Sequence, residues 1–294
     1  MSNKTKRVAL LIHCSDRYEL LFRGFHYFFS KYWDYSIPCT YYFATEEKDI
    51  PFPEFKNIKS GKGEWSTRLK ILLEEKIEEE YILYFQEDMW LNKKVNAAFF
   101  EELFNLTIKN KWNQVKLHSS GVYKTIETRY FIEGFNVAEV DNKNSKFLMS
   151  HQVTLWQKGY LLTQLLENES PWLNETLATK RLKELNPEII HIDYFAENGG
   201  SEINKNKNPI GRSEYQAISV NSCFYHTIRP YIQELMQGDK ERKKYARKLR
   251  HHYIFQITHD GSARPRKESM FMDFKIWLKG LRPRLSYALS GILK

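Results

Sequence analysis

Two adjacent carboxylates that interrupt an apolar run are the residues best suited to chemistry in this sequence. Residues 81–91 read Tyr-Ile-Leu-Tyr-Phe-Gln-Glu-Asp-Met-Trp-Leu, and their short, apolar start predicts a buried strand. Glu87 and Asp88 follow Gln86 at its tip, where two carboxylates are costly unless a positive group neutralises them. A divalent cation that also binds the diphosphate of a nucleotide-sugar would neutralise both. The alternative is a solvated acidic turn.

A second group of polar residues follows the first apolar run of the chain. Residues 7–14 predict a central strand, and residues 19–33 carry an apolar stripe at helical spacing. Ligands of open α/β sheets bind at the carboxyl ends of strands. We therefore expect Asp16 and Tyr18, in the turn between strand and helix, to lie near the base and ribose of a nucleotide. Ser15 or Asp16 would alternatively be only the N-cap of the helix.

The order of the apolar segments predicts the fold class. Strands at 35–45 and 81–91 alternate with helices at 19–33 and 64–77, as in a parallel sheet with crossover helices. We expect an α/β fold with a mostly parallel central sheet flanked by helices. Further patterns predict helices at 95–109, 158–167, 176–185 and 232–252, and strands at 114–118, 147–156, 187–194 and 218–226.

The chain changes character after residue 230. Its formal net charge is +9, and basic residues dominate residues 240–294. Residues 271–293 mix Trp, Phe and Leu with Lys and Arg, a pattern typical of a helix lying on an anionic membrane surface. We therefore divide the chain into a main domain at 1–230 and a basic amphipathic helical region at 231–294. The alternative is a C-terminal helix packed on its own domain.

Composition bears on the class of protein and its compartment. With 42% hydrophobic and 15% aromatic residues, the chain has the material for a core and is unlike a disordered protein. Cys14, Cys39 and Cys223 are too widely spaced for a zinc site or a disulfide framework. The sequence shows no signal peptide and no apolar run of about 18 residues. We expect a cytoplasmic protein.

Five motifs, in order, carry a family resemblance. They are Cys14-Ser-Asp-Arg-Tyr18, Trp65-Ser-x-Arg68-Leu69, the run at 81–90, Thr154-Leu-Trp-Gln-Lys-x-Tyr-Leu161 and Ser170-Pro-Trp-x-x-Glu175. Over about residues 6–229 the sequence resembles bacterial GT-A glycosyltransferases of surface-polysaccharide gene clusters, which build lipopolysaccharide or capsule. The order of the motifs is more specific than any one of them. The resemblance implies a GT-A, Rossmann-like fold, with the basic tail outside it.

The resemblance also implies roles for individual residues. Gln86, Glu87 and Asp88 stand where such enzymes carry an Asp-x-Asp signature. Asp88 would bind the metal, Mn²⁺ or Mg²⁺, and Glu87 or Gln86 would contact the metal or the ribose. His226 would complete the metal site, or it is a histidine without that role. Because Gln86 replaces the first acid, metal dependence stays open. The nucleotide pocket would be lined by Ser15, Asp16, Tyr18 and Arg68.

Glu175 is the predicted general base. It follows Pro171 and Trp172 near a helix start, where the chain can present a side chain into a cleft. A carboxylate opposite the leaving diphosphate can take the acceptor proton, and the reaction would then invert the anomeric centre. Trp172 would offer a flat face to a sugar ring. The alternative is an acidic residue favoured at a helix N-terminus by the helix dipole.

We therefore expect a glycosyltransferase that moves a sugar from a nucleotide-diphosphate donor, a UDP-sugar by preference, to a hydroxyl of a glycan or lipid-linked acceptor. It would be peripheral on the inner face of the bacterial membrane, held there by residues 240–294. One alternative is a sugar-phosphate nucleotidyltransferase, although no Gly-rich phosphate loop follows the first strand. The other is a non-enzymatic nucleic-acid binder. We expect no nucleic acid, because the sequence has no recognition motif.

Overall fold

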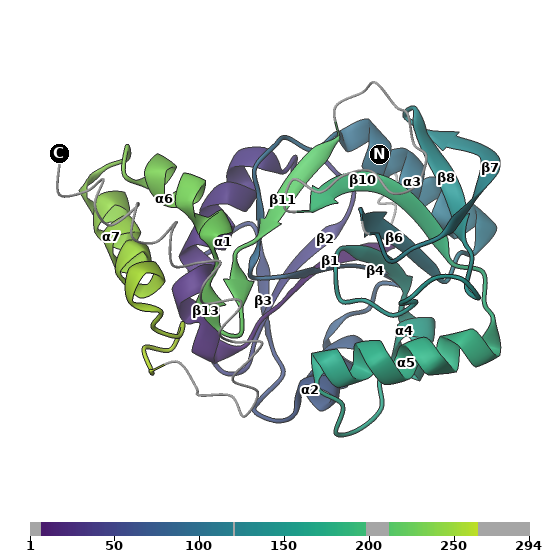
Figure 1. The fold of residues 1–294 in the computed structure, drawn as a ribbon, viewed down its shortest axis with the longest axis horizontal. Helices are drawn as coiled ribbons and strands as arrows, with labels where there is room; N and C mark the ends of the chain where they lie inside the picture. Colours follow the sequence, from purple (N-terminus) through teal and green to yellow (C-terminus); the bar gives the residue numbers. More distant parts are fainter. Residues whose placement is uncertain (1–6, 120, 198–211, 264–294) are drawn as a thin grey trace. The chain divides into compact units, whose positions relative to one another are not determined.

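A large mixed sheet organises the residues that the computed structural model describes, which are 7–119, 121–197 and 212–263 (Figure 1). The strands of this sheet are β1 (Val8–His13), β2 (Thr40–Thr45), β3 (Lys56–Lys59), β4 (Tyr81–Gln86), β5 (Met89–Leu91), β6 (Gln114–His118), β7 (Thr125–Ile132), β8 (Phe135–Val140), β9 (Thr154–Gln157), β10 (Ile190–Glu197) and β11 (Ser213–Ala217). They run in the order β3-β2-β1-β4-β9-β6-β10-β11-β5, and the β7–β8 hairpin joins through β10. A small second sheet pairs β12 (Ser219–Val220) with β13 (Cys223–Phe224).

β1 lies in the parallel part of the sheet. It pairs in parallel with β2 and β4, so that His13 lies opposite both Ala44 and Gln86. The pairs β2–β3, β10–β6 and β10–β11 are also parallel, whereas β9 runs antiparallel between β4 and β6. All six residues of β1 are buried, as expected for an apolar strand covered on both faces. The predicted α/β class with a mostly parallel central sheet is confirmed.

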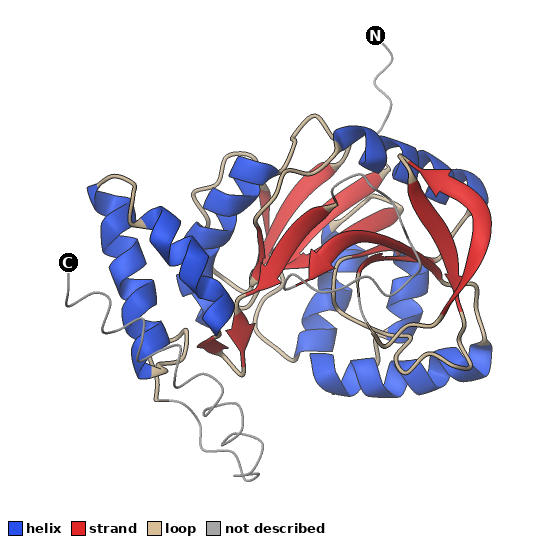
Figure 2. Cartoon of the chain, turned by 45° about the horizontal axis from the view of Figure 1, so that its top comes forward, coloured by secondary structure: helices blue, strands red, loops and turns tan. Residues whose placement is uncertain are grey.

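Helices flank this sheet (Figure 2). The helices are α1 (Glu19–Tyr32), α2 (Trp65–Ile71), α3 (Ala97–Asn110), α4 (Lys158–Gln164), α5 (Pro171–Leu185), α6 (Arg229–Leu235) and α7 (Lys240–Phe255), with short turns η1 (Asp16–Tyr18), η2 (Leu72–Lys76) and η3 (His226–Ile228). Adjacent strand residues point to opposite faces, so Tyr84 and Phe85 of β4 mark two layers. Phe85 contacts Phe29 of α1 with ring centroids 5.9 Å apart. Tyr84 belongs to the layer of α2, α4 and α5.

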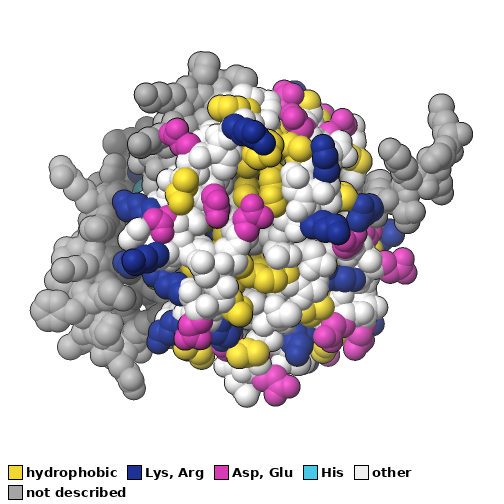
Figure 3. All heavy atoms as spheres, turned by 90° about the vertical axis from the view of Figure 1, so that its right-hand side faces the viewer, with side chains coloured by type: hydrophobic (Ala, Val, Ile, Leu, Met, Phe, Trp, Pro, Cys, Tyr) yellow, Lys and Arg dark blue, Asp and Glu magenta, His cyan; other side chains and the backbone are white. Residues whose placement is uncertain are grey.

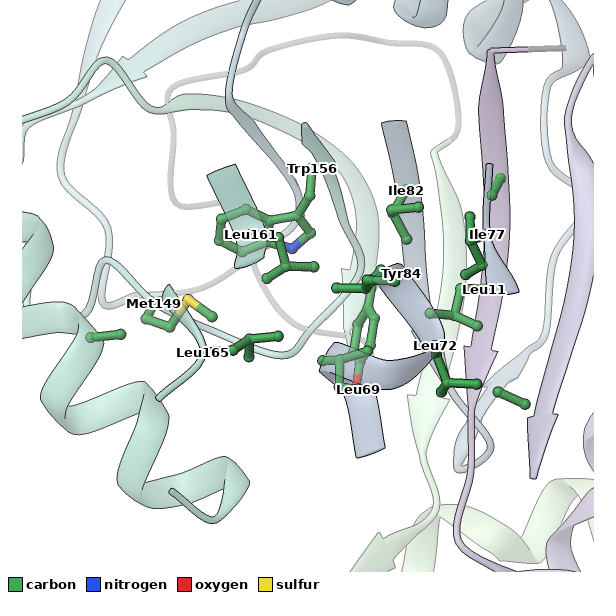
Figure 4. Close-up of a cluster of buried hydrophobic side chains, with 14 of the residues drawn as sticks. Leu11, Leu69, Leu72, Ile77, Ile82, Tyr84, Met149, Trp156, Leu161 and Leu165 are labelled. Atoms are coloured by element: carbon green, nitrogen blue, oxygen red, sulfur yellow. The ribbon is translucent and has the colours of Figure 1, made fainter. Parts of the chain in front are cut away.

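That layer is an apolar cluster (Figure 4). Leu69 of α2, Leu161 of α4 and Leu182 of α5 pack in it with Ile82 and Trp156 of the sheet. Each fully buried side chain of this kind contributes about 1.5–3 kcal/mol relative to its exposure. The cluster therefore fixes the three helices against one face of the sheet.

The start of α5 differs from the prediction. The helix begins at Pro171 rather than near residue 176, because Ser170 caps it: the Ser170 hydroxyl accepts the Leu173 N–H at 3.3 Å. Proline suits the first helical position, where its missing N–H is not needed. Trp172 and Glu175 consequently lie inside the first turns of the helix.

Other predicted elements are shorter or divided in the structure: the strands at 81–91, 147–156 and 218–226 and the helix at 232–252. Asn221 and Ser222 both have positive φ, 52° and 61°, in the two-residue turn that divides β12 from β13. The side chain of Asp239 accepts the Arg242 N–H at 2.8 Å and starts a new helix, α7. Local turn and cap chemistry divides these elements where hydrophobic periodicity alone does not.

The chain divides into two compact units. The first contains Met1–Asp16, His26–Glu87 and Leu91–Tyr215, and the second contains Arg17–Phe25, Asp88–Trp90 and Gln216–Lys294. The division predicted at 1–230 and 231–294 rests on composition and stays a prediction. The amphipathic pattern at 271–293 lies outside the described residues. Among the helices that are described, none is long and apolar enough to cross a membrane.

The second unit packs around Trp90. The buried Trp90 indole meets the Tyr231 ring edge-on, and the Tyr231 hydroxyl donates to the Trp90 carbonyl at 2.6 Å. The Tyr245 hydroxyl accepts the Gly24 N–H at 3.0 Å and donates to the Leu20 carbonyl at 2.7 Å. A Cβ on Gly24 would lie 2.0 Å from Trp90 Cη2. Only glycine fits there without displacing the indole.

We predict that Gly24→Ala lowers the free energy of unfolding by about 3 kcal/mol, because the buried indole has to move. Urea unfolding of the two proteins measures this difference. Gly159→Ala in α4 is the matched control, since the nearest atom there is the end of the flexible Gln157 side chain at 3.2 Å. Equal losses in the two variants would contradict the role given to Trp90.

Candidate active site

One face of the sheet changes from apolar to polar toward the carboxyl ends of β1, β4 and β6. Cross-strand register aligns Tyr84, Thr154, Lys116 and His191 in one row, so their side chains share a face. On the same face, the preceding row contains Ile82 and Trp156, which belong to the apolar cluster. All four residues of the polar row are buried. This row is therefore where the core meets groups that need polar partners.

A chain of contacts joins the end of β1 to α5. His13 Nδ1 and the Tyr84 hydroxyl share a hydrogen bond of 3.1 Å. The Trp65 ring centroid lies 6.1 Å from that of His13 and 4.4 Å from that of His151. The His151 backbone N–H donates to Glu175 Oε1 at 2.8 Å. These contacts bring the predicted base, Glu175, to the edge of the sheet at which β1 and β4 end.

Glu175 is fixed at one carboxylate oxygen and only partly buried. Burial raises its pKa, while the hydrogen bond from the His151 N–H and the charge of Lys116 oppose that rise. A partly exposed carboxylate with a raised pKa is suited to accept a proton near neutral pH. Its bound oxygen is held by a residue outside the helix, in the segment 147–153, which turns the side chain toward the sheet.

Lys116 lies in the polar row without solvent contact. The side chain is fully buried, and its Nζ has no hydrogen-bond partner among the described residues. It lies 4.9 Å from the centroid of the Tyr123 ring, a favourable cation–π distance. Burial lowers the pKa of Lys116 to about 7, and the charge of Glu175 opposes this. An uncompensated buried ammonium of this kind costs stability.

Neutral histidines surround Lys116. His118 Nε2 and the Tyr123 hydroxyl share a hydrogen bond of 2.9 Å, and His191 Nε2 donates to the His118 carbonyl at 2.9 Å. Burial lowers the pKa of His191 to about 4 and that of His151 to about 3. Burial, followed by the charge of Lys116, also places the pKa of His118 well below its usual value. These three imidazoles are therefore neutral at pH 7 and make their hydrogen bonds in that form.

The predicted nucleotide residues Ser15, Asp16 and Arg68 meet around a residue that the sequence did not indicate, Glu46. The Glu46 carboxylate accepts the Asp16 N–H at 3.0 Å and the Ser15 hydroxyl at 3.3 Å, and it lies 3.3 Å from Arg68 Nη1. The Asp16 carboxylate in turn accepts three backbone N–H groups of residues 46–48, at 2.9–3.1 Å. The loops after β1 and β2 are thereby locked together.

Arg68 links this lock to the start of α2. Its Nη1 donates to the Cys14 carbonyl and its Nε to the Gly63 carbonyl, both at 3.1 Å. The guanidinium is buried and ion-paired with Glu46. The sequence could have indicated Glu46, because Glu46 follows β2 as Ser15 follows β1. Two neighbouring parallel strands present their next residues at one edge.

The remaining predicted residues fall in both units. Gln86 ends β4 and the buried Glu87 follows it in the first unit. Asp88, Tyr18 and His226 belong to the second unit. The Tyr18 hydroxyl is 2.8 Å from Ser222 Oγ, within hydrogen-bond distance. His226 stands in η3 against the Tyr225 ring. Partial burial, then the charge of Arg229, lower its pKa.

The fit of the predicted metal is partial. Burial raises the pKa of Asp88 to about 6, as expected for a carboxylate removed from water. In the part of the chain that the structure describes, however, no group of three or more His, Cys, Asp or Glu residues could hold a metal ion. The metal roles of Glu87, Asp88 and His226 therefore stay predictions.

Trp172 and Trp156 have opposite environments. Trp172, on the first turn of α5, is 65% exposed. It therefore presents a free aromatic face three residues before Glu175. Trp156 is 1% exposed and is a core residue of the apolar cluster.

No protein-family model and no protein of curated function matches this sequence. Among solved structures, S. aureus TarS is similar over 84% of this chain and 43% of its own, with 12% identity and a TM-score of 0.45. TarS 1-349 in complex with UDP-GlcNAc is similar over 84% of this chain and 71% of its own, with 11% identity and a TM-score of 0.42. A UDP-glucose pyrophosphorylase complexed with UDP-glucose is similar over 64% of this chain and 90% of its own, with 10% identity and a TM-score of 0.39.

The chain spans less than half the length of the first of these structures.

Stability should depend on the protonation of Lys116. The pKa of a lysine in an unfolded chain is about 10.4, whereas burial lowers that of Lys116 to about 7. Between these values the unfolded chain binds the extra proton, so the free energy of unfolding rises with pH, by at most about 1.4 kcal/mol per pH unit. We predict that Lys116→Met removes this slope between pH 7 and 9 and leaves stability at pH 7 equal or higher. Urea unfolding at several pH values is the measurement.

Lys180→Met, on the exposed side of α5, is the matched control and should keep the slope of the parent protein. A slope unchanged in Lys116→Met would mean that Lys116 is solvated in solution.

Proposed function

We propose that this protein is a nucleotide-sugar-dependent glycosyltransferase in which Glu175 is the general base of an inverting transfer. One observation carries the proposal: the half-buried Glu175 carboxylate lies at the sheet edge where β1 and β4 end, held there through His13, Trp65 and His151. Ser15 follows β1 and Gln86 ends β4 at that edge, because His13 and Gln86 are paired. A donor bound across these strand ends would place its sugar beside Glu175.

The chemistry uses the free oxygen of that carboxylate. Glu175 Oε2 takes the proton of the acceptor hydroxyl while the acceptor oxygen forms a bond to the anomeric carbon. The bond from that carbon to the diphosphate oxygen breaks, and its electron pair leaves with the nucleoside diphosphate. Attack from the face opposite the leaving group inverts the anomeric centre. Burial raises the pKa of Glu175 toward neutral pH, and a higher pKa makes the carboxylate a stronger base.

The leaving diphosphate needs positive charge or hydrogen-bond donors. A divalent cation, Mn²⁺ or Mg²⁺, would supply that charge when bound, with Asp88 as its first protein ligand and with Glu87 and His226 as further candidates. The proposed nucleotide-sugar residues are Ser15, Asp16, Tyr18, Arg68, Gln86, Glu87 and Trp172. The carboxylate oxygens of Asp16 already accept backbone N–H groups of the loop after β2. Asp16 would therefore act by shaping the loop beside the nucleotide.

The finer parts of the proposal concern the substrates and the location. A UDP-sugar is the proposed donor, a glycan or lipid-linked hydroxyl is the acceptor, and bacterial surface-polysaccharide synthesis is the setting. Trp172, with its exposed ring, would stack on an acceptor sugar. The protein would work in the cytoplasm at an anionic membrane surface. The exposed Lys243 and Lys244 of α7 support this, since the helix buries its opposite side through Tyr245 and Leu249.

Donor turnover tests the reaction. Incubation with UDP-, GDP- and CMP-sugars, with and without Mn²⁺, should release free sugar and nucleotide from one donor. We predict that Glu175→Gln lowers this rate by about 10²–10⁴-fold, because the base is lost, and that Asp88→Asn abolishes any metal-dependent part. Glu184→Gln, on the exposed side of α5, is the control and should keep the parent rate.

Two outcomes would contradict the proposal. Full activity of Glu175→Gln would contradict the role of Glu175 as the base. Failure to turn over any donor would contradict the glycosyltransferase function. Formation of a nucleoside triphosphate from a nucleotide-sugar and pyrophosphate would instead identify a nucleotidyltransferase.

Flotation with vesicles of anionic and of zwitterionic lipid tests the location. We predict that the parent protein floats with anionic vesicles and that the double change Lys243→Glu and Lys244→Glu lowers the bound fraction several-fold, because each basic residue near such a surface contributes about 1 kcal/mol. The double change Lys180→Glu and Lys183→Glu on the exposed side of α5 is the matched control. Equal binding by both double variants would rule out α7 as the docking face.

A further inference from the structure

Strand β6 and helix α5 face each other across one connecting segment. Gln114 Nε2 of β6 donates to the Leu148 carbonyl at 3.2 Å. The Leu148 and Met149 N–H groups donate to Thr179 Oγ1 of α5 at 3.2 Å and 3.0 Å. Residues 148–149 are therefore held from one side by the strand and from the other by the helix.

The same arrangement continues one step toward the carboxyl ends of the strands. Lys116 is two residues beyond Gln114 and shares its face of the sheet. Glu175 is four residues before Thr179 and shares its face of the helix. Between them lies His151, whose backbone N–H donates to Glu175 Oε1. Lys116 and Glu175 thus face each other across the connecting segment.

Among the described residues, Glu175 is the one acid whose charge acts on Lys116. The described groups that interact with Lys116 besides Glu175 are His118 of its own strand, His191 of β10, His151 of the connecting segment and the Tyr123 ring. Asp193 stands two residues beyond His191 on β10. Asp193 is ion-paired with Arg212. The three imidazoles are buried and neutral, because burial lowers the pKa of each. The carboxylate that acts on Lys116 is that of Glu175.

We propose that Lys116 is a positioning residue for Glu175: its buried ammonium, placed beneath the partly exposed carboxylate, keeps that carboxylate ionised and ready to accept a proton. The proposal rests on the proposed function only where it calls Glu175 the base; the coupling between the two side chains stands by itself. Each charge stabilises the ionised form of the other group: the charge of Lys116 lowers the pKa of Glu175, and the charge of Glu175 raises the pKa of Lys116.

The decisive measurement is the titration of Glu175 by NMR. Protein labelled with ¹³C in its glutamate carboxyl groups gives a Glu175 signal that Glu175→Gln identifies. We expect Lys116→Met to move the midpoint of this titration to higher pH by about one unit, and Lys116→Arg to restore it toward that of the parent protein. A midpoint unmoved in a folded Lys116→Met variant overturns the proposal.

A reciprocal experiment covers the case in which the Lys116 variants do not fold. In protein labelled with ¹³C at lysine Cε, the Glu175→Gln change should move the titration midpoint of Lys116 to lower pH, because coupling between two sites is mutual. The substitution is at a partly exposed position and keeps the shape of the side chain. A Lys116 midpoint that stays in place overturns the coupling.

Turnover measurements separate this proposal from the proposed function. If a donor is turned over, the acidic limb of the pH–rate profile should move to higher pH in Lys116→Met and return in Lys116→Arg, an effect that loss of packing alone does not produce. If no donor is turned over and the NMR coupling is present, the proposed function fails and the coupling stands. If donors are turned over and neither midpoint moves, the inference about Lys116 fails alone.

Discussion

The parallel pairing of β1 with β4 is the constraint on which the rest of the arrangement depends. Because His13 lies opposite Gln86, the residues that follow both strands leave the sheet at one edge. The apolar cluster fixes α2, α4 and α5 against the same face (Figure 4), and so determines what can reach that edge from outside the sheet. The polar row is the boundary of that cluster, and Glu175 is the carboxylate that α5 delivers to it.

Buried polar groups have opposite consequences in different parts of this edge. Around Glu46 they are mutually satisfied: carboxylates accept backbone N–H groups, and Arg68 compensates the charge. In the polar row, by contrast, an ammonium is buried beside neutral histidines. The first group stabilises the loops that it joins. The second group lowers stability, and such concentrations of shifted pKa values are typical of functional sites.

Much of the fold could be predicted from the sequence, and the reasons are local. The first strand, the first helix and β6 are found at or within about a residue of their predicted bounds, since each has one dominant periodicity. The prediction was wrong where a cap or turn decides, as at Ser170 and Asp239. Of the site residues, the structure brings together Ser15, Asp16 and Arg68. Lys116 and His151 gave no signal, because a lone basic residue in an apolar strand acquires meaning only from cross-strand neighbours.

On the side of β7, α3 and α5, the outer surface is neither mainly acidic nor mainly basic. Figure 3 shows acidic, basic and hydrophobic side chains interspersed on that side. Ile126 and Phe131 of β7 are exposed apolar residues. The chemical distinctiveness of the first unit therefore lies in its buried polar row rather than on this face.

The direction of β9 determines how the edge can be altered. Since β9 runs opposite to β4 and β6, the segment that enters it, rather than the one that leaves it, arrives at the edge where β4 and β6 end. Residues 148–151 of this segment are fixed by Gln114, Thr179 and Glu175, so its length and composition can vary only upstream of Leu148. Insertions there would alter the surroundings of Glu175 and leave the sheet unchanged.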